Sequence, residues 1–155
     1  MPSSVAELGY ELSLRAIEEQ ESRLGDLRGR AGTLLAAASI ASSFLGGQSI
    51  RAGDLSILGV LAVLAYLGCV GACIKVLLPH RLVLAFRGSV LVKAAREATV
   101  ADADEAMEAA TGWIERFVED NRTQLDDLSR WYTAACLALG AEVVLWVLGA
   151  PGILE

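Results

Sequence analysis

One carboxylate stands inside an otherwise uncharged apolar stretch of this chain. Glu142 lies within residues 131–149, where every other side chain is uncharged. If this stretch crosses a bilayer, inserting Glu142 costs roughly 2.5–3.5 kcal/mol, which makes it a candidate for function. Such a carboxyl can line a pore, bind a proton, or hydrogen-bond to Ser39, Ser42 or Ser43 on another helix. It can equally be structural, with a partner on a neighbouring helix, or lie close enough to the outer surface to reach water.

Four basic residues form a second candidate site. Arg81, Arg87, Lys93 and Arg96 follow Pro79 in a mixed apolar and basic segment. Guanidinium and ammonium groups in such a cluster can receive an anionic lipid headgroup or a nucleotide. The alternative is that these charges only set membrane topology, beside the lipid headgroups.

The remaining reactive residues point to no enzyme chemistry. The sequence holds no Walker-type phosphate loop, no HExxH, no CxxC and no serine nucleophile elbow. Cys69 and Cys73 share a helix face, but His80 is the single histidine, so we interpret the cysteines as small packing residues. We therefore expect no enzyme activity, no metal and no cofactor. A net charge of -6 also argues against nucleic acid as a partner.

The elements that must position these residues are long helices. Residues 31–50 and 55–74 carry no charge, and each would form a helix about 30 Å long, the thickness of a bilayer core. We predict an all-α, single-domain integral membrane bundle with three transmembrane helices, two of them extended by long cytoplasmic helices. Its parts are a cytoplasmic helix (4–30), span 1 (31–50), span 2 (55–78), a juxtamembrane segment (79–102), a second cytoplasmic helix (103–130) and span 3 (131–149).

The distribution of positive charge predicts how these spans are oriented. Of the 13 Lys and Arg residues, all but Arg51 lie before span 1 or between spans 2 and 3. Cytoplasmic loops carry the excess of Lys and Arg in membrane proteins. We therefore expect a multi-pass protein of the bacterial inner membrane, with its N-terminus in the cytoplasm and its C-terminus outside.

Each predicted cytoplasmic helix carries one apolar stripe. Apolar residues recur at three-, four- and seven-residue steps, a spacing typical of helices that pack against a partner. We expect the two stripes to face each other in a helical stalk; the alternative is that each lies on the membrane surface. Asn121 interrupts the second stripe. The stripe residues are Leu14, Ile17, Leu24 and Ala31 in the first helix, and Met107, Ala110, Ile114, Phe117, Leu125 and Leu128 in the second.

Small residues at regular spacing predict close helix packing. Gly25, Gly29 and Gly32 fall near one another and indicate either a close crossing or a hinge, of which we favour the crossing. Small pairs four residues apart allow helices to approach within one subunit or between copies. Three spans make a thin bundle, so we expect a homo-oligomer in the lipid bilayer. The pairs used here are Ser39 with Ser43 and Ala134 with Ala138.

The layout of the chain resembles a group of small bacterial membrane proteins. The resemblance rests on the segment 30–35 (RAGTLL), on Leu77-Leu78-Pro79 at the end of span 2, and on Asn121 followed by Arg130 before the last span. The group includes, or closely neighbours, the transmembrane effectors of Pycsar anti-phage systems and SLATT-type effectors. The chain departs from the group in having Arg30 where lysine is commoner, and three spans in place of two or four.

This resemblance implies a function but no ligand site. It implies assembly in the inner membrane and impairment of that membrane when a cyclic nucleotide signals infection. The competing hypothesis is a non-enzymatic scaffold that binds a partner through its cytoplasmic helices. A third hypothesis is a soluble bundle that buries the apolar stretches, which extraction only by detergent would exclude.

Overall fold

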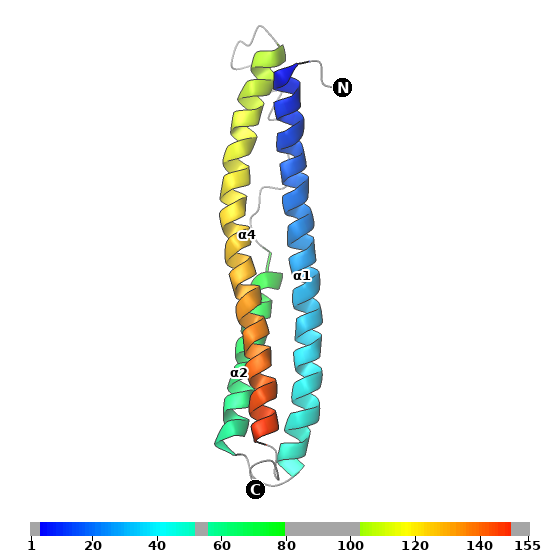
Figure 1. The fold of residues 1–155 in the computed structure, drawn as a ribbon, viewed down its shortest axis with the longest axis vertical. Helices are drawn as coiled ribbons and strands as arrows, with labels where there is room; N and C mark the ends of the chain where they lie inside the picture. The colour runs from blue at the N-terminus through cyan, green and yellow to red at the C-terminus, as the bar shows by residue number, and fades with distance from the viewer. Residues whose placement is uncertain (1–3, 52–55, 80–102, 150–155) are drawn as a thin grey trace. The chain divides into compact units, whose positions relative to one another are not determined.

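A computed structural model describes residues 4–51, 56–79 and 103–149, which form three α-helices (Figure 1). They are α1 (Val5–Arg51), α2 (Ile57–Leu77) and α4 (Ala103–Leu148). The prediction of an all-α fold is confirmed. The basic cluster of Arg81, Arg87, Lys93 and Arg96 lies outside the described residues.

Helices α1 and α4 are both unusually long. They contain 47 and 46 residues, respectively, whereas helices of globular proteins average about 11–12. Neither contains proline, and the side-chain hydroxyls of Ser13 and Thr111 bond back to carbonyls within their own helix without breaking it. Each helix therefore continues through a charged part and an apolar part without interruption.

Local chemistry fixes both ends of α2. The hydroxyl of Ser56 accepts a hydrogen bond from the Gly59 backbone N–H at 3.2 Å, which caps the N-terminus. At the other end, the Leu78 N–H donates to the Ile74 carbonyl, and Leu78 itself leaves the helical region with ψ at 146°. Because Pro79 follows, Leu78 is restricted away from helical geometry, so the helix ends there.

Two helices among the described residues are long and apolar enough to cross a membrane. They are α2, with a mean hydropathy of 2.5, and the part of α4 from Met107 to Leu148, with 1.7. Only 28% and 17%, respectively, of their most apolar segments are buried, whereas a core helix of a soluble protein is mostly buried. The apolar part of α1 (31–50) does not join them, because Ala, Ser and Gly dilute its apolarity. Its role as a span stays a prediction.

The chain divides into two compact units. Of the described residues, the first unit holds 4–25 of α1 and 103–126 of α4. The second unit holds 26–51 of α1, all of α2, and α4 from residue 127. The charged side chains of α1 and α4 are shared between both units, whereas the predicted spans belong to the second.

In the first unit, α1 and α4 run parallel and side by side (Figure 1). A Cβ on Gly9 would lie 3.9 Å from Thr111, and Gln20 bonds to Val118, so residue numbers rise together along both helices. The two apolar stripes meet here, as expected for a stalk. Their buried members are Ile17, Leu24, Ala110, Ile114 and Leu125.

In the second unit, α2 joins this parallel pair in the opposite direction. Arg28 of α1 lies at the end of α2 and Ser39 lies near Tyr66, so residue numbers along α1 and α2 run in opposite senses. The core is built from small side chains, which let three helices approach closely. It consists of Ala38, Cys69, Ala72, Cys73 and Ala135, with Leu34, Leu35, Tyr66, Ala138 and Leu139 packed around it. Both core cysteines are free thiols, as expected for packing residues.

We expect Gly46→Ala to destabilise the second unit and Gly47→Ala to stabilise it. A Cβ on Gly46 would lie 3.2 Å from the Trp146 indole, whereas one on Gly47 would meet nothing within 4 Å. Overpacking costs about 1–3 kcal/mol, and replacing a helical glycine by alanine gains about 1 kcal/mol. Thermal unfolding of the detergent-purified variants, followed by circular dichroism, measures both effects. Equal shifts in the two variants would contradict the close approach at Gly46.

Candidate functional site: a polar layer in the three-helix unit

Glu142 is fully buried between α1 and α4 in the second unit. The Ser42 hydroxyl of α1 donates a hydrogen bond to Glu142 Oε1 at 2.5 Å. A hydroxyl bound to a carboxyl group over this distance is a strong hydrogen bond. Of the three serines that the sequence offers as partners, the structure therefore selects Ser42. The carboxyl faces the interior of the unit, away from the surface that lipid would cover.

The other two serines serve different partners. Ser39 donates to the Leu35 carbonyl at 2.9 Å, and its oxygen lies 3.4 Å from the Tyr66 hydroxyl of α2. Ser43 is exposed and donates to the Ser39 carbonyl at 2.7 Å. Both hydroxyls therefore satisfy backbone carbonyls of their own helix, and neither reaches Glu142.

Two buried polar atoms near this bond have no partner among the described residues. They are Glu142 Oε2 and the indole nitrogen of Trp146, one helical turn further along α4. Trp146 packs on Gly46, which lies one turn beyond Ser42 on α1. We call Ser42, Glu142 and Trp146 the polar layer. An unsatisfied buried polar group costs about 1–3 kcal/mol, so two in one layer require a physical cause.

The polar layer lacks a compensating positive charge. Among the described residues, ion pairs join Arg23 to Glu19 and Arg30 to Asp26, and both are solvent-exposed pairs on α1. From α2, the thiol of Cys69 lies within electrostatic range of Glu142. The layer thus offers a carboxyl, a hydroxyl and an indole N–H. These groups bind small polar species, and they do not form a nucleophile with a general base.

Sequence reasoning missed a set of basic residues at one end of the second unit. Arg28 donates from Nη2 to the Leu78 carbonyl at 3.4 Å, a long bond to one of the free carbonyls at the end of α2. Lys75 lies in the last turn of the same helix, where a positive charge is favourable. The signal was present in the sequence, because both residues directly flank the apolar stretches.

The interpretation of Asn121 as an interruption of the apolar stripe is wrong. Asn121 is buried in the first unit, and its amide donates to Gln20 Oε1 at 3.2 Å. Gln20 in turn donates to the Val118 carbonyl at 2.7 Å. Asn121 therefore belongs to the stripe, as a polar member paired across the helices. The heptad spacing of Ile114, Asn121 and Leu128 was the signal that could have shown it.

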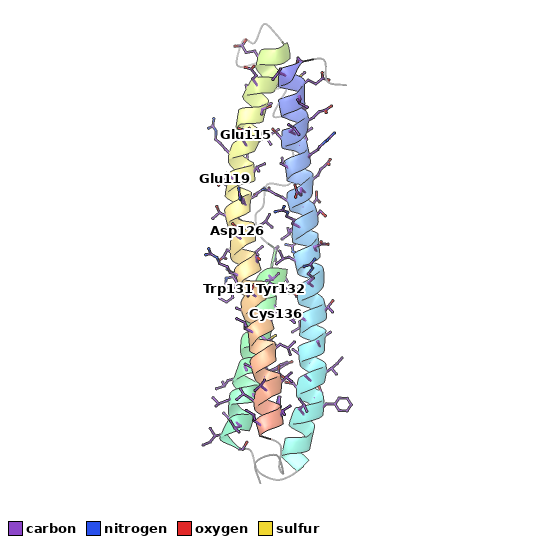
Figure 2. The ribbon with its side chains drawn as sticks, in the orientation of Figure 1. Glu115, Glu119, Asp126, Trp131, Tyr132 and Cys136 are labelled. Atoms are coloured by element: carbon purple, nitrogen blue, oxygen red, sulfur yellow. The ribbon has the colours of Figure 1, made fainter. Side chains whose placement is uncertain are left out.

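Beside this pair the first unit has an open groove of about 390 Å³. Its apolar part comes from Ala16, Val118 and Leu125, and its rim carries charges of both signs. Figure 2 shows α4 with Glu115, Glu119 and Asp126 labelled along this part of the helix. The charged and polar lining residues are Glu19, Gln20, Arg23, Arg122 and Asp126.

The predicted small-residue contacts are only partly present within the chain. Gly25, Gly29 and Gly32 are not buried, and a Cβ on any of them would meet nothing within 4 Å. They therefore form no close crossing within either unit. Of the pair Ala134 and Ala138, the first is exposed and the second packs against the core.

The described residues define an all-α protein with two helices able to span a membrane, and nothing in them gives a more specific class. They hold no group of three His, Cys, Asp or Glu side chains suited to a metal ion. No known protein family, no curated protein and no solved structure matches the chain.

Proposed function

We propose that this chain is a small protein of the bacterial inner membrane that impairs the membrane in response to a cytoplasmic signal. The observation that carries the membrane placement is the exposed apolar surface of α2 and α4. Val60, Leu64 and Leu67 of α2 and Val144 of α4 are between 49% and 57% exposed. Surface of this kind is favourable against lipid tails and unfavourable in water.

The charge distribution supports an orientation with the first unit in the cytoplasm. Arg28 and Lys75 lie where α1 and α2 enter and leave their apolar stretches, and Arg130 stands at the same point of α4. Trp131, next to Arg130 and 42% exposed, has the amphipathic ring that favours the membrane interface (Figure 2). Three predicted spans with this collar would place the N-terminus inside and the C-terminus outside.

Continuity of α1 and α4 supports a route from signal to membrane. Residues bonded between these helices are separated by 101 positions at Gln20–Asn121 in the first unit and by 100 at Ser42–Glu142 in the second. Both pairings thus use one parallel register. Because each helix is unbroken, sliding α1 along α4 would break both polar pairs. A signal that shifts this register would thereby loosen the membrane bundle.

Induced expression tests this function directly. We expect the chain to sediment with membranes, to be released only by detergent, and to depolarise cells when a cyclic nucleotide is supplied. The cyclic nucleotide is chosen because of the resemblance to nucleotide-signalled effectors. A chain that leaves the membrane potential unchanged under every cyclic nucleotide tested would refute the effector role. Release by salt or alkali without detergent would refute the membrane placement.

A scaffold is the second candidate, and the groove in the first unit favours it. A groove of about 390 Å³ with an apolar part and charges of both signs suits a partner helix. A scaffold should be harmless when expressed and should be lost or destabilised without its partner. Substituting Arg122, on the rim, should then abolish partner recovery and leave the membrane potential unaffected.

A further inference from the structure

The polar layer holds one more component than the side chains described so far. We propose that a single water molecule is bound between α1 and α4, accepting a hydrogen bond from Trp146 Nε1 and donating one to Glu142 Oε2. The third partner is the Ser42 hydroxyl oxygen, which still has a free lone pair while it donates to Glu142 Oε1. This site is independent of the effector role.

The two unpartnered atoms are complementary in chemistry. Trp146 Nε1 is a donor only, and a carboxyl oxygen accepts hydrogen bonds. Both atoms are buried and without a partner among the described residues. Buried waters in proteins typically make about three hydrogen bonds to groups that would otherwise be unsatisfied. One water therefore satisfies both atoms at once.

The packing places these atoms in the same layer. Glu142 and Trp146 are four residues apart on α4, and so share one helix face. That face meets α1, because Ser42 bonds to Glu142 and the Trp146 indole carbon Cζ2 lies 3.2 Å from the Cβ position of Gly46. In the indole ring Cζ2 lies beside the carbon that bears the nitrogen. The donor edge of the indole is therefore turned toward α1, where the Ser42 and Glu142 oxygens lie.

The surroundings make water the fitting ligand. The layer carries no second carboxylate and, among the described residues, no metal-binding group, so it lacks the oxygen ligands that a cation needs. The groups next to it are the Cys69 thiol of α2 and the small side chains of the core. A neutral molecule the size of water adds hydrogen bonds here without adding charge.

Nuclear magnetic resonance on the full-length protein in detergent micelles tests the site. With ¹⁵N-labelled tryptophan, the three indole N–H signals come from Trp113, Trp131 and Trp146, and Trp146→Phe identifies the last. We expect the Trp146 indole proton to exchange slowly with solvent and yet to show a cross-relaxation peak with a long-lived water. Exposed Trp131 provides the contrast, since its indole proton should exchange quickly.

Matched variants distinguish a bound water from a direct indole–carboxyl bond and from relay through a hydroxyl proton. Glu142→Leu should abolish the water peak at Trp146 and leave Trp113 unchanged, whereas Glu142→Gln, which keeps an oxygen acceptor, should retain it. Ser42→Ala removes the hydroxyl proton and should also retain the peak. A wild-type Trp146 signal without a water peak would overturn the proposal, as would evidence of a direct indole bond to the Glu142 carboxyl. The wild-type measurement decides even if a variant does not fold.

Discussion

Replacing Glu142 by leucine is expected to make insertion of the last apolar segment about 3 kcal/mol more favourable and to abolish membrane depolarisation. The first effect follows because a charged residue near the helix centre costs roughly 2.5–3.5 kcal/mol, whereas leucine is favourable. The second follows because leucine cannot accept the Ser42 hydrogen bond that joins α4 to α1. An insertion assay with glycosylation reporters measures the first effect, and a potential-sensitive dye measures the second.

Two control variants make this result specific. Glu142→Gln keeps the shape and an acceptor for Ser42, so the bundle should hold together. Val143→Leu changes the adjacent, partly exposed position and should alter neither insertion nor depolarisation. If Glu142→Leu depolarises cells as strongly as the wild type, the polar layer has no part in function and the buried carboxyl is structural.

The second large effect concerns the Gln20–Asn121 pair. Gln20→Leu should destabilise the first unit by about 1–3 kcal/mol, because it removes one hydrogen-bond partner of the buried Asn121 amide. The double variant Gln20→Leu/Asn121→Leu should regain that stability, since two apolar groups pack without unmet hydrogen bonds. It should nevertheless lose the unique register, because a buried polar pair specifies register in coiled coils.

A pair of cysteines reports the register. A Cβ on Gly9 lies close to Thr111, so Gly9→Cys/Thr111→Cys should form a disulfide efficiently in the otherwise wild-type chain. The yield should fall when both Leu substitutions are added, although the melting temperature recovers. Thr123→Leu, at an exposed position of α4, serves as the control and should change stability by less than about 0.5 kcal/mol. An unchanged disulfide yield in the double Leu variant would show that apolar packing alone sets the register.

Buried positions at seven-residue intervals explain why the apolar stripes were readable from the sequence. Ile17, Leu24, Ala31 and Ala38 are all buried in α1. A seven-residue repeat keeps one face of a helix toward its partner, and this repeat is a property of residue order alone. The stripes could therefore be found without knowing what they packed against. The same reasoning located Asn121 but misread it, because a polar residue in a stripe has meaning only once its partner is known.

The polar partners could not be predicted from residue order. Ser39, Ser42 and Ser43 all lie within about one turn of each other, and the rotation of α1 against α4 decides which one faces Glu142. Residue order likewise offered no reason to pair Trp146 with Gly46, because the two are 100 residues apart. Such choices depend on the register between helices, which is fixed by the summed packing of many side chains.

The sequence by itself determined three long helices, the absence of recognisable enzyme motifs, and the segregation of charge from apolar stretches, because these follow from local residue order. The tertiary structure decided which polar groups meet: Gln20 with Asn121 in the first unit, and Ser42 with Glu142 in the second. It also decided that Glu142 faces the protein interior and not lipid. The physical reason is that helix rotation and register are set by contacts between segments separated by 100 or 101 residues at these pairs.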